Sequence, residues 1–184
     1  MNTNTKFFNF AAPFFNSIDN GSLFKKPFLW LYTLIAIINL LIPVFVFSRM
    51  KDFYMFEYNL VEYILVLIIL TFSSWISFQL WWNRRSNLIS SSSEGDDFIA
   101  TPIFAHFIQT LGESIGINIA VGGFGTALVF QIITGTTGEI GYLVGVPGYI
   151  FLFGPIFGFF TLVAFRFIAE QFRALSSIAN NTKK

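Results

Sequence analysis

Two long apolar stretches constrain this chain more than any other feature of its sequence. The first runs from Pro27 to Ser48 without a charged side chain, and the second runs from Leu60 to Trp82 with Glu62 at its start. A helix needs roughly 20 predominantly apolar residues to cross the ~30 Å hydrocarbon core of a bilayer. Only 11% of the 184 residues are charged, whereas soluble domains average about 25%. Both stretches are therefore predicted to be transmembrane helices.

The second half of the chain carries two further candidate spans. Residues 115–134 are rich in glycine, and residues 142–165 are long and uncharged but contain Pro147 and Pro155. Neighbouring helices can satisfy the backbone groups that a proline frees inside a membrane. The joint between the two stretches, GTTGEIG, has the residues of a tight turn. We predict an antiparallel hairpin; the alternative is a three-span chain in which 115–134 is a re-entrant segment.

The placement of positive charges favours four spans. Four spans put both termini and the 83–97 loop on one side of the membrane, which then holds nine of the 11 Lys and Arg residues: Lys6, Lys25, Lys26, Arg84, Arg85, Arg166, Arg173, Lys183 and Lys184. The other side holds Arg49 and Lys51. Cytoplasmic segments carry an excess of Lys and Arg, so we predict that both termini are cytoplasmic. The first apolar run is too long for a signal-peptide core, so we expect no cleaved signal peptide.

These spans predict an all-α integral membrane protein with four transmembrane helices in two hairpins, a cytoplasmic interfacial helix and a C-terminal cytoplasmic helical extension. The chain then divides into a cytoplasmic or interfacial N-terminal segment (1–26), the first hairpin (27–82), a polar cytoplasmic loop (83–97), the interfacial helix with the second hairpin (98–165) and a helical tail (166–184).

Two segments outside the predicted spans have helical periodicity. Residues 98–111 have apolar side chains at helical spacing, which predicts an amphipathic helix lying on the cytoplasmic face of the membrane. In the tail, apolar residues recur in steps of three and four, at Phe165, Ile168, Phe172, Leu175 and Ala179. This heptad-type stripe predicts a packing surface. Its partner is either the 98–111 helix and the membrane surface, or another protein or a second copy of the chain.

Small residues recur at four-residue spacing in the second predicted hairpin. They are Gly112, Gly116, Ala120, Gly123 and Ala127 in and before the third span, and Gly141, Gly145, Gly154 and Gly158 in and before the fourth. Lipid tails give helices no hydrophobic reason to associate, whereas small residues let two backbones approach closely. We therefore predict that these residues pack the two spans together. A glycine-lined substrate path is the alternative.

Three polar residues could belong to an ion or proton pathway: His106, Glu113 and Asn118. An ionisable side chain deep in a bilayer is costly and usually functional. However, His106 and Glu113 precede the apolar run that starts at Ile115, so contact with water or head groups is the other interpretation. Asn118 lies inside the span and is expected to hydrogen bond between helices. A single histidine without cysteine does not form a usual metal-ligand set, so we expect no metal, no cofactor and no catalytic residue.

From about residue 97 onward, the order of parts resembles a family of small, uncharacterised bacterial membrane proteins. In that family, two glycine-rich spans are followed by an Arg-x-x-x-Glu helix, and here the motif is Arg166 to Glu170. The resemblance covers about half of the chain and does not include the first hairpin. It implies a bacterial origin, and hence the cytoplasmic (inner) membrane, but no particular activity.

The sequence thus favours a non-catalytic accessory, scaffold or assembly subunit. Its expected partners are the lipid bilayer and other membrane proteins, or a second copy of the chain, bound through the second hairpin and the tail. The alternative is a small homo-oligomeric channel or transporter lined by the third span. A net charge of +1 gives no reason to expect nucleic acid as a partner.

Overall fold

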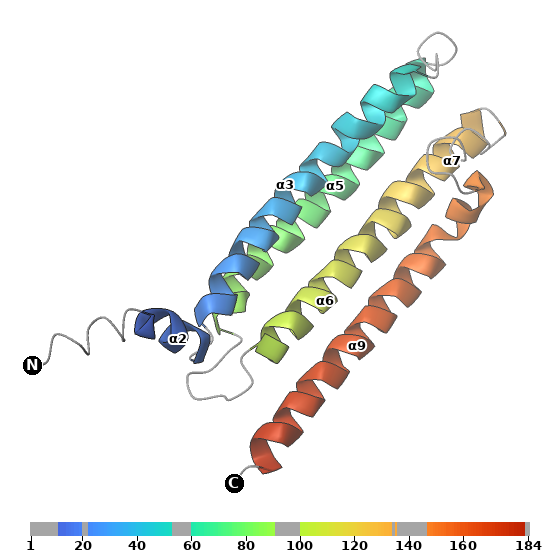
Figure 1. Cartoon of the computed structure of the whole chain (residues 1–184). Helices are drawn as coiled ribbons and strands as arrows, with labels where there is room; N and C mark the ends of the chain where they lie inside the picture. The colour runs from blue at the N-terminus through green and yellow to red at the C-terminus, as the bar shows by residue number, and fades with distance from the viewer. Residues whose placement is uncertain are drawn as a thin grey trace, which may run out of the picture.

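The computed structural model describes residues 11–19, 22–52, 60–90, 100–133, 135 and 147–182, and every element in these ranges is helical (Figure 1). The elements are α2 (Ala12–Asp19), α3 (Ser22–Asp52), α5 (Leu60–Ser90), α6 (Ala100–Ile117), η1 (Asn118–Gly123), α7 (Phe124–Ile133), η2 (Gly148–Phe153) and α9 (Gly154–Thr182). Most of the GTTGEIG joint, including Gly141, lies outside the described residues, as does Gly145.

Four of the described helical segments are long and apolar enough to cross a membrane: Lys26–Arg49, Leu60–Leu88, Thr101–Ile133 and Gly148–Thr182. This confirms the prediction of an all-helical protein with four such segments. The segments lie side by side in two pairs, α3 with α5 and α6 with α9 (Figure 1). The start of α3, the end of α5, the start of α6 and the end of α9 gather at one end of the bundle, which we call the tail end.

The third long segment differs from the sequence-based prediction. α6, η1 and α7 follow one another without a break, and Ile117 and Phe124 at the two junctions have the same right-handed helical dihedrals (φ −63°, ψ −47°). The described part of 98–111 is therefore the beginning of this long helix and not an element of its own. Its amphipathic spacing has another cause, because Ile103 and Ala105 are fully buried inside the bundle.

The middle of this helix widens into a π-helical turn, η1, from Asn118 to Gly123. Such turns are rare and occur frequently at functional sites. The turn contains Gly122 and Gly123, which cost least where the backbone must leave α-helical geometry. The widened turn thus begins at the polar residue that lies nearest the middle of the third span.

The two pairs of helices share two apolar cores. Near the tail end, Tyr32 and Ala36 of α3 pack with Trp81 and Leu88 of α5 and with Ile103 of α6. Near the other end, α5 packs against α7 through a second cluster, whose buried members are Tyr63, Val66, Ala127, Val129 and Phe130. The third long helix therefore contacts α5 along most of its length, while its opposite side contacts α9.

Candidate functional site

The third long helix carries a polar stripe, along α6 and into the first residue of η1, on the side that faces α3 and α5. Its residues are spaced four apart, at His106, Thr110, Ser114 and Asn118, and residues with this spacing share one face of a helix. Thr110 and Ser114 are buried. The stripe is the candidate functional site, because buried polar groups within a membrane span are costly unless they are paired.

The tail-end part of the stripe contacts α3. The hydroxyl of Tyr32 lies 2.7 Å from Nδ1 of His106 and 3.3 Å from Oγ1 of Thr110. The Tyr32 ring is fully buried and meets the Trp81 ring edge to face, with centroids 4.8 Å apart. Thr110 also donates to the backbone carbonyl of His106, at 2.8 Å. The histidine side chain is therefore held by a tyrosine from another helix.

The deeper part of the stripe is a hydrogen-bonded cluster centred on Asn118. Its Nδ2 lies 3.0 Å from Oγ of Ser77 and 3.3 Å from Oδ1 of Asn39, and its Oδ1 accepts a 3.0 Å hydrogen bond from Ser73. The Ser114 hydroxyl lies 3.5 Å from the same Asn39 oxygen. One amide of η1 thus connects the third long helix with α3 and α5, which agrees with the predicted type of interaction and identifies its partners.

A second polar chain runs around α6 at the tail end. Arg84 of α5 forms an ion pair with Glu113, and Gln109 donates a 2.9 Å hydrogen bond to the other oxygen of Glu113. Arg173 of α9 donates to Gln109 at 2.6 Å. This Arg84–Glu113–Gln109–Arg173 chain, which we call the charged chain, links three helices. Glu113 retains only 14% of its side-chain exposure, so it contacts protein more than water.

The predicted small residues lie mainly on the side of the third helix that faces α9. A methyl group added at Gly116 would lie 2.8 Å from the carbonyl oxygen of Gly158, and one added at Gly158 would lie 2.6 Å from that of Gly116. These distances are shorter than ordinary contacts, so the two backbones touch. Gly154 approaches the carbonyl oxygen of Ile119 in the same way, at 2.6 Å.

The other predicted small residues have several different neighbours. Gly112 lies against the Phe165 side chain, Ala120 against Gly158, and Gly123 against the Phe151 ring. Ala127 is an exception, because it is buried in the α5-facing cluster.

The tail stripe is shifted from its predicted positions. Phe165 contacts Gly112, and Phe172 meets the Phe104 ring edge to face at 5.5 Å. In contrast, Ile168 and Leu175 remain 42% and 62% exposed, while Ala169 and Ser176 are buried. The face that packs on α6 is therefore Phe165, Ala169, Phe172 and Ser176. Prediction from large apolar residues missed the small residues on this face, which close packing favours.

Several residues of the polar networks were not predicted from the sequence, among them Tyr32, Asn39, Ser73, Ser77, Arg84, Thr110 and Ser114. A signal was present for some of them, since Asn39 is the one amide within the first apolar stretch and Ser73 and Ser77 are four residues apart. Nothing in one sequence indicates which helix these groups meet. That information comes from the arrangement of the four helices.

The polar stripe provides hydrogen bonds, and the charged chain adds one ion pair and the hydrogen bonds of Gln109 with Glu113 and Arg173. Within the described ranges, no three His, Asp or Glu side chains gather as a metal site would require. Comparisons with protein-family models, with curated proteins and with solved structures found no match for this chain.

Proposed function

We propose that this chain is an integral accessory or scaffold subunit of a bacterial cytoplasmic membrane, which acts by binding another membrane protein. The observation that carries the proposal is the outer face of the α9 tail, where Ile168, Leu175 and Ile178 are 42%, 62% and 60% exposed. Exposed apolar groups that lie outside lipid mark surfaces where proteins bind.

The length of α9 supports placing this face outside the lipid. Its 29 residues span about 43 Å at 1.5 Å per residue, which exceeds the ~30 Å hydrocarbon core. Arg166 lies near the midpoint of the helix and Glu170 and Arg173 lie in its tail half, and a charge within hydrocarbon would be costly. With the predicted cytoplasmic termini, the last turns of α9 project into the cytoplasm, and Leu175 and Ile178 have no lipid to cover them.

The glycine residues between α6 and α9 are poor places for a partner to bind, since their surfaces are already occupied. Gly116, Gly154 and Gly158 contact the chain's own backbone across α6 and α9, so a partner cannot use the same surfaces without separating the two helices. We therefore place the partner on the tail rather than on the second hairpin as a whole. The partner-binding surface, which the sequence analysis assigned to the second hairpin and the tail, is thereby reduced to one face of α9.

A channel or transporter is the second candidate, because the polar stripe along α6 reaches the middle of the third span. Ions or polar substrates follow such stripes where the groups line a water-filled path. Here Asn118 and Ser73 already bind each other, and Thr110 binds Tyr32. These mutual hydrogen bonds favour a role in holding the helices together.

The test is co-purification of the full chain from its own membrane in a mild detergent, followed by identification of stoichiometric partners by mass spectrometry. Leu175→Ser combined with Ile178→Ser is expected to reduce the partner at least tenfold while the chain remains in the membrane. Ala174→Ser with Ser177→Ala is the matched control, because both residues are exposed on the same turns, and it is expected to retain the partner. Isolation of the native chain without a partner, or flux through liposomes that contain only this chain, would overturn the proposal.

A further inference from the structure

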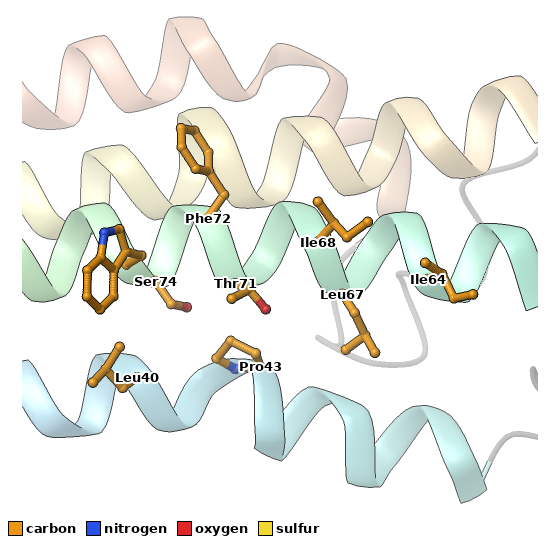
Figure 2. A pocket seen from close by; sticks show the side chains of 9 residues that line it. Leu40, Pro43, Ile64, Leu67, Ile68, Thr71, Phe72 and Ser74 are labelled. Atoms are coloured by element: carbon orange, nitrogen blue, oxygen red, sulfur yellow. The ribbon is translucent and has the colours of Figure 1, made fainter.

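A groove of about 520 Å³ lies between α3 and α5, on a different part of the molecule from the tail (Figure 2). It lies within the segments Lys26–Arg49 and Leu60–Leu88, which are apolar enough to span the membrane. Its lining is almost entirely apolar and includes Pro43 from α3 and Ile64, Leu67, Thr71, Ser74 and Trp75 from α5. If these segments span the membrane, the groove opens to the lipid.

The sequence explains why side chains do not fill this space. Pro43 lies inside α3, and a proline within a helix bends it and removes one backbone donor. On the opposite wall, α5 presents the small side chains of Thr71 and Ser74 toward α3 (Figure 2). A bend facing two small residues leaves a gap that larger residues would have closed.

Ser74 contributes a polar group, its hydroxyl, to the lining of the groove. The side chain is 1% exposed and lines the groove, yet its hydroxyl has no hydrogen-bond partner among the residues that the structure describes. Buried hydroxyl groups are nearly always paired, because an unpaired one keeps the cost of leaving water. The described residues offer this hydroxyl no hydrogen-bond acceptor, so we infer that a ligand with an acceptor oxygen supplies one.

The dimensions of the groove select a thin ligand. From Ile64 to Trp75 the α5 wall is about 16 Å long at 1.5 Å per residue. A volume of about 520 Å³ then corresponds to a mean cross-section of roughly 30 Å², whereas an α-helix about 10 Å wide needs roughly 80 Å². The groove is therefore too narrow to enclose a partner helix, whereas a single hydrocarbon chain fits in it.

We propose that this groove binds one neutral, single-chain lipid whose head group carries an acceptor oxygen, with Ser74 donating the hydrogen bond. Trp75 follows Ser74 in α5 and also lines the groove, so a flat oxygen-bearing head group bound at Ser74 packs against its ring. The aliphatic tail extends past Leu67 toward Ile64. The described lining residues include no charged side chain, so the ligand is uncharged, as in an alkyl-substituted benzoquinone.

Trp75 provides a reporter for the test. Decylbenzoquinone, a tryptophan quencher, is titrated into the full-length chain in nanodiscs, and the same titration is made on Trp75→Phe. The difference between the two curves isolates Trp75. Saturating quenching at a low mole fraction of quinone is expected, and quenching that rises linearly without saturation would overturn the proposal.

Two substitutions at Ser74 distinguish the contribution of its hydrogen bond from that of the open space in the groove. Ser74→Ala keeps the groove open and removes the donor, so at least fivefold weaker binding is expected. Ser74→Leu fills the groove and is expected to abolish saturation. Phe160→Leu, on the exposed side of α9, is the matched control and is expected to leave binding unchanged.

Bromododecane, which quenches tryptophan but has no acceptor oxygen, completes the test. It is expected to compete poorly with decylbenzoquinone. Equal competition, or unchanged binding in Ser74→Ala, would overturn the proposed role of the oxygen. Neither outcome depends on the tail, so this test is independent of partner binding.

Discussion

The two helix pairs, α3 with α5 and α6 with α9, associate by different means. Between α6 and α9, the backbones of Gly116 and Gly158 approach to contact, without room for a methyl group. Between α3 and α5, larger groups meet, including the Tyr32 and Trp81 rings, and Pro43 borders an open groove. Lipid provides no hydrophobic drive for association, so close packing and hydrogen bonds must provide it. The α6–α9 pair depends on close packing, whereas the α3–α5 pair needs additional contacts.

The polar stripe of α6 supplies those additional contacts. Asn118 hydrogen bonds with Asn39 of α3 and with Ser73 and Ser77 of α5. The third helix therefore has a small-residue side toward α9 and a polar side toward the other pair. This comparison predicts that substitutions of equal size have unequal effects on the two sides.

The largest expected effect is on the glycine contact. Gly158→Leu places a side chain against the backbone of Gly116 and Ala120, which cannot move aside as a flexible side chain can. Overpacking costs about 1–3 kcal/mol and occasionally more, and we expect the upper part of this range in the free energy of unfolding, measured by steric trapping in bicelles. Ala164→Leu, on an exposed position of the same helix, is the control and is expected to cost little. Equal losses for the two variants would contradict the proposed backbone contact.

A smaller effect is expected at the polar cluster. Asn118→Ala removes the hydrogen bonds to Asn39, Ser73 and Ser77 together. Hydrogen bonds between membrane helices average about 0.6 kcal/mol each, so we expect a loss of about 2 kcal/mol in the same assay. Ser77→Ala removes a single contact and should cost about a third as much. A double-mutant cycle in which the two losses simply add would show that the side chains are not coupled.

The charged chain is expected to contribute less. Glu113→Gln keeps a group that can hydrogen bond with Gln109 but removes the charge that Arg84 pairs with. Both side chains retain some exposure, 24% for Arg84 and 14% for Glu113, so the loss should lie near 1 kcal/mol, between surface and fully buried pairs. The loss should shrink at high salt, because salt screens the pair. A loss that does not change with salt would mean that packing, rather than charge, holds this contact.

The sequence was sufficient to predict the four long apolar helices, because length and lack of charge determine that property locally. It was not sufficient to place 98–111. Helical spacing shows that a face is apolar, but not whether lipid or another helix covers it. The same limit applies to the tail, where Ala169 and Ser176 rather than Ile168 and Leu175 face α6. The packed face combines Ala169 and Ser176 with Phe165 and Phe172, so side-chain size alone does not identify it.

The smallest expected effect provides the sharpest contrast between the two pairs. Thr71→Leu enlarges a side chain that faces the groove, where about 520 Å³ is open. Gly116→Ala adds only one methyl group, yet it would meet the Gly158 carbonyl oxygen at 2.8 Å. The free energy of unfolding should change by less than about 0.5 kcal/mol for Thr71→Leu, as for substitutions away from tight packing, and fall by at least about 1 kcal/mol for Gly116→Ala. Because the larger addition is expected to cost less, side-chain size alone cannot account for such a result. If Thr71→Leu costs more than Gly116→Ala, the distinction between an open α3–α5 pair and a close-packed α6–α9 pair fails.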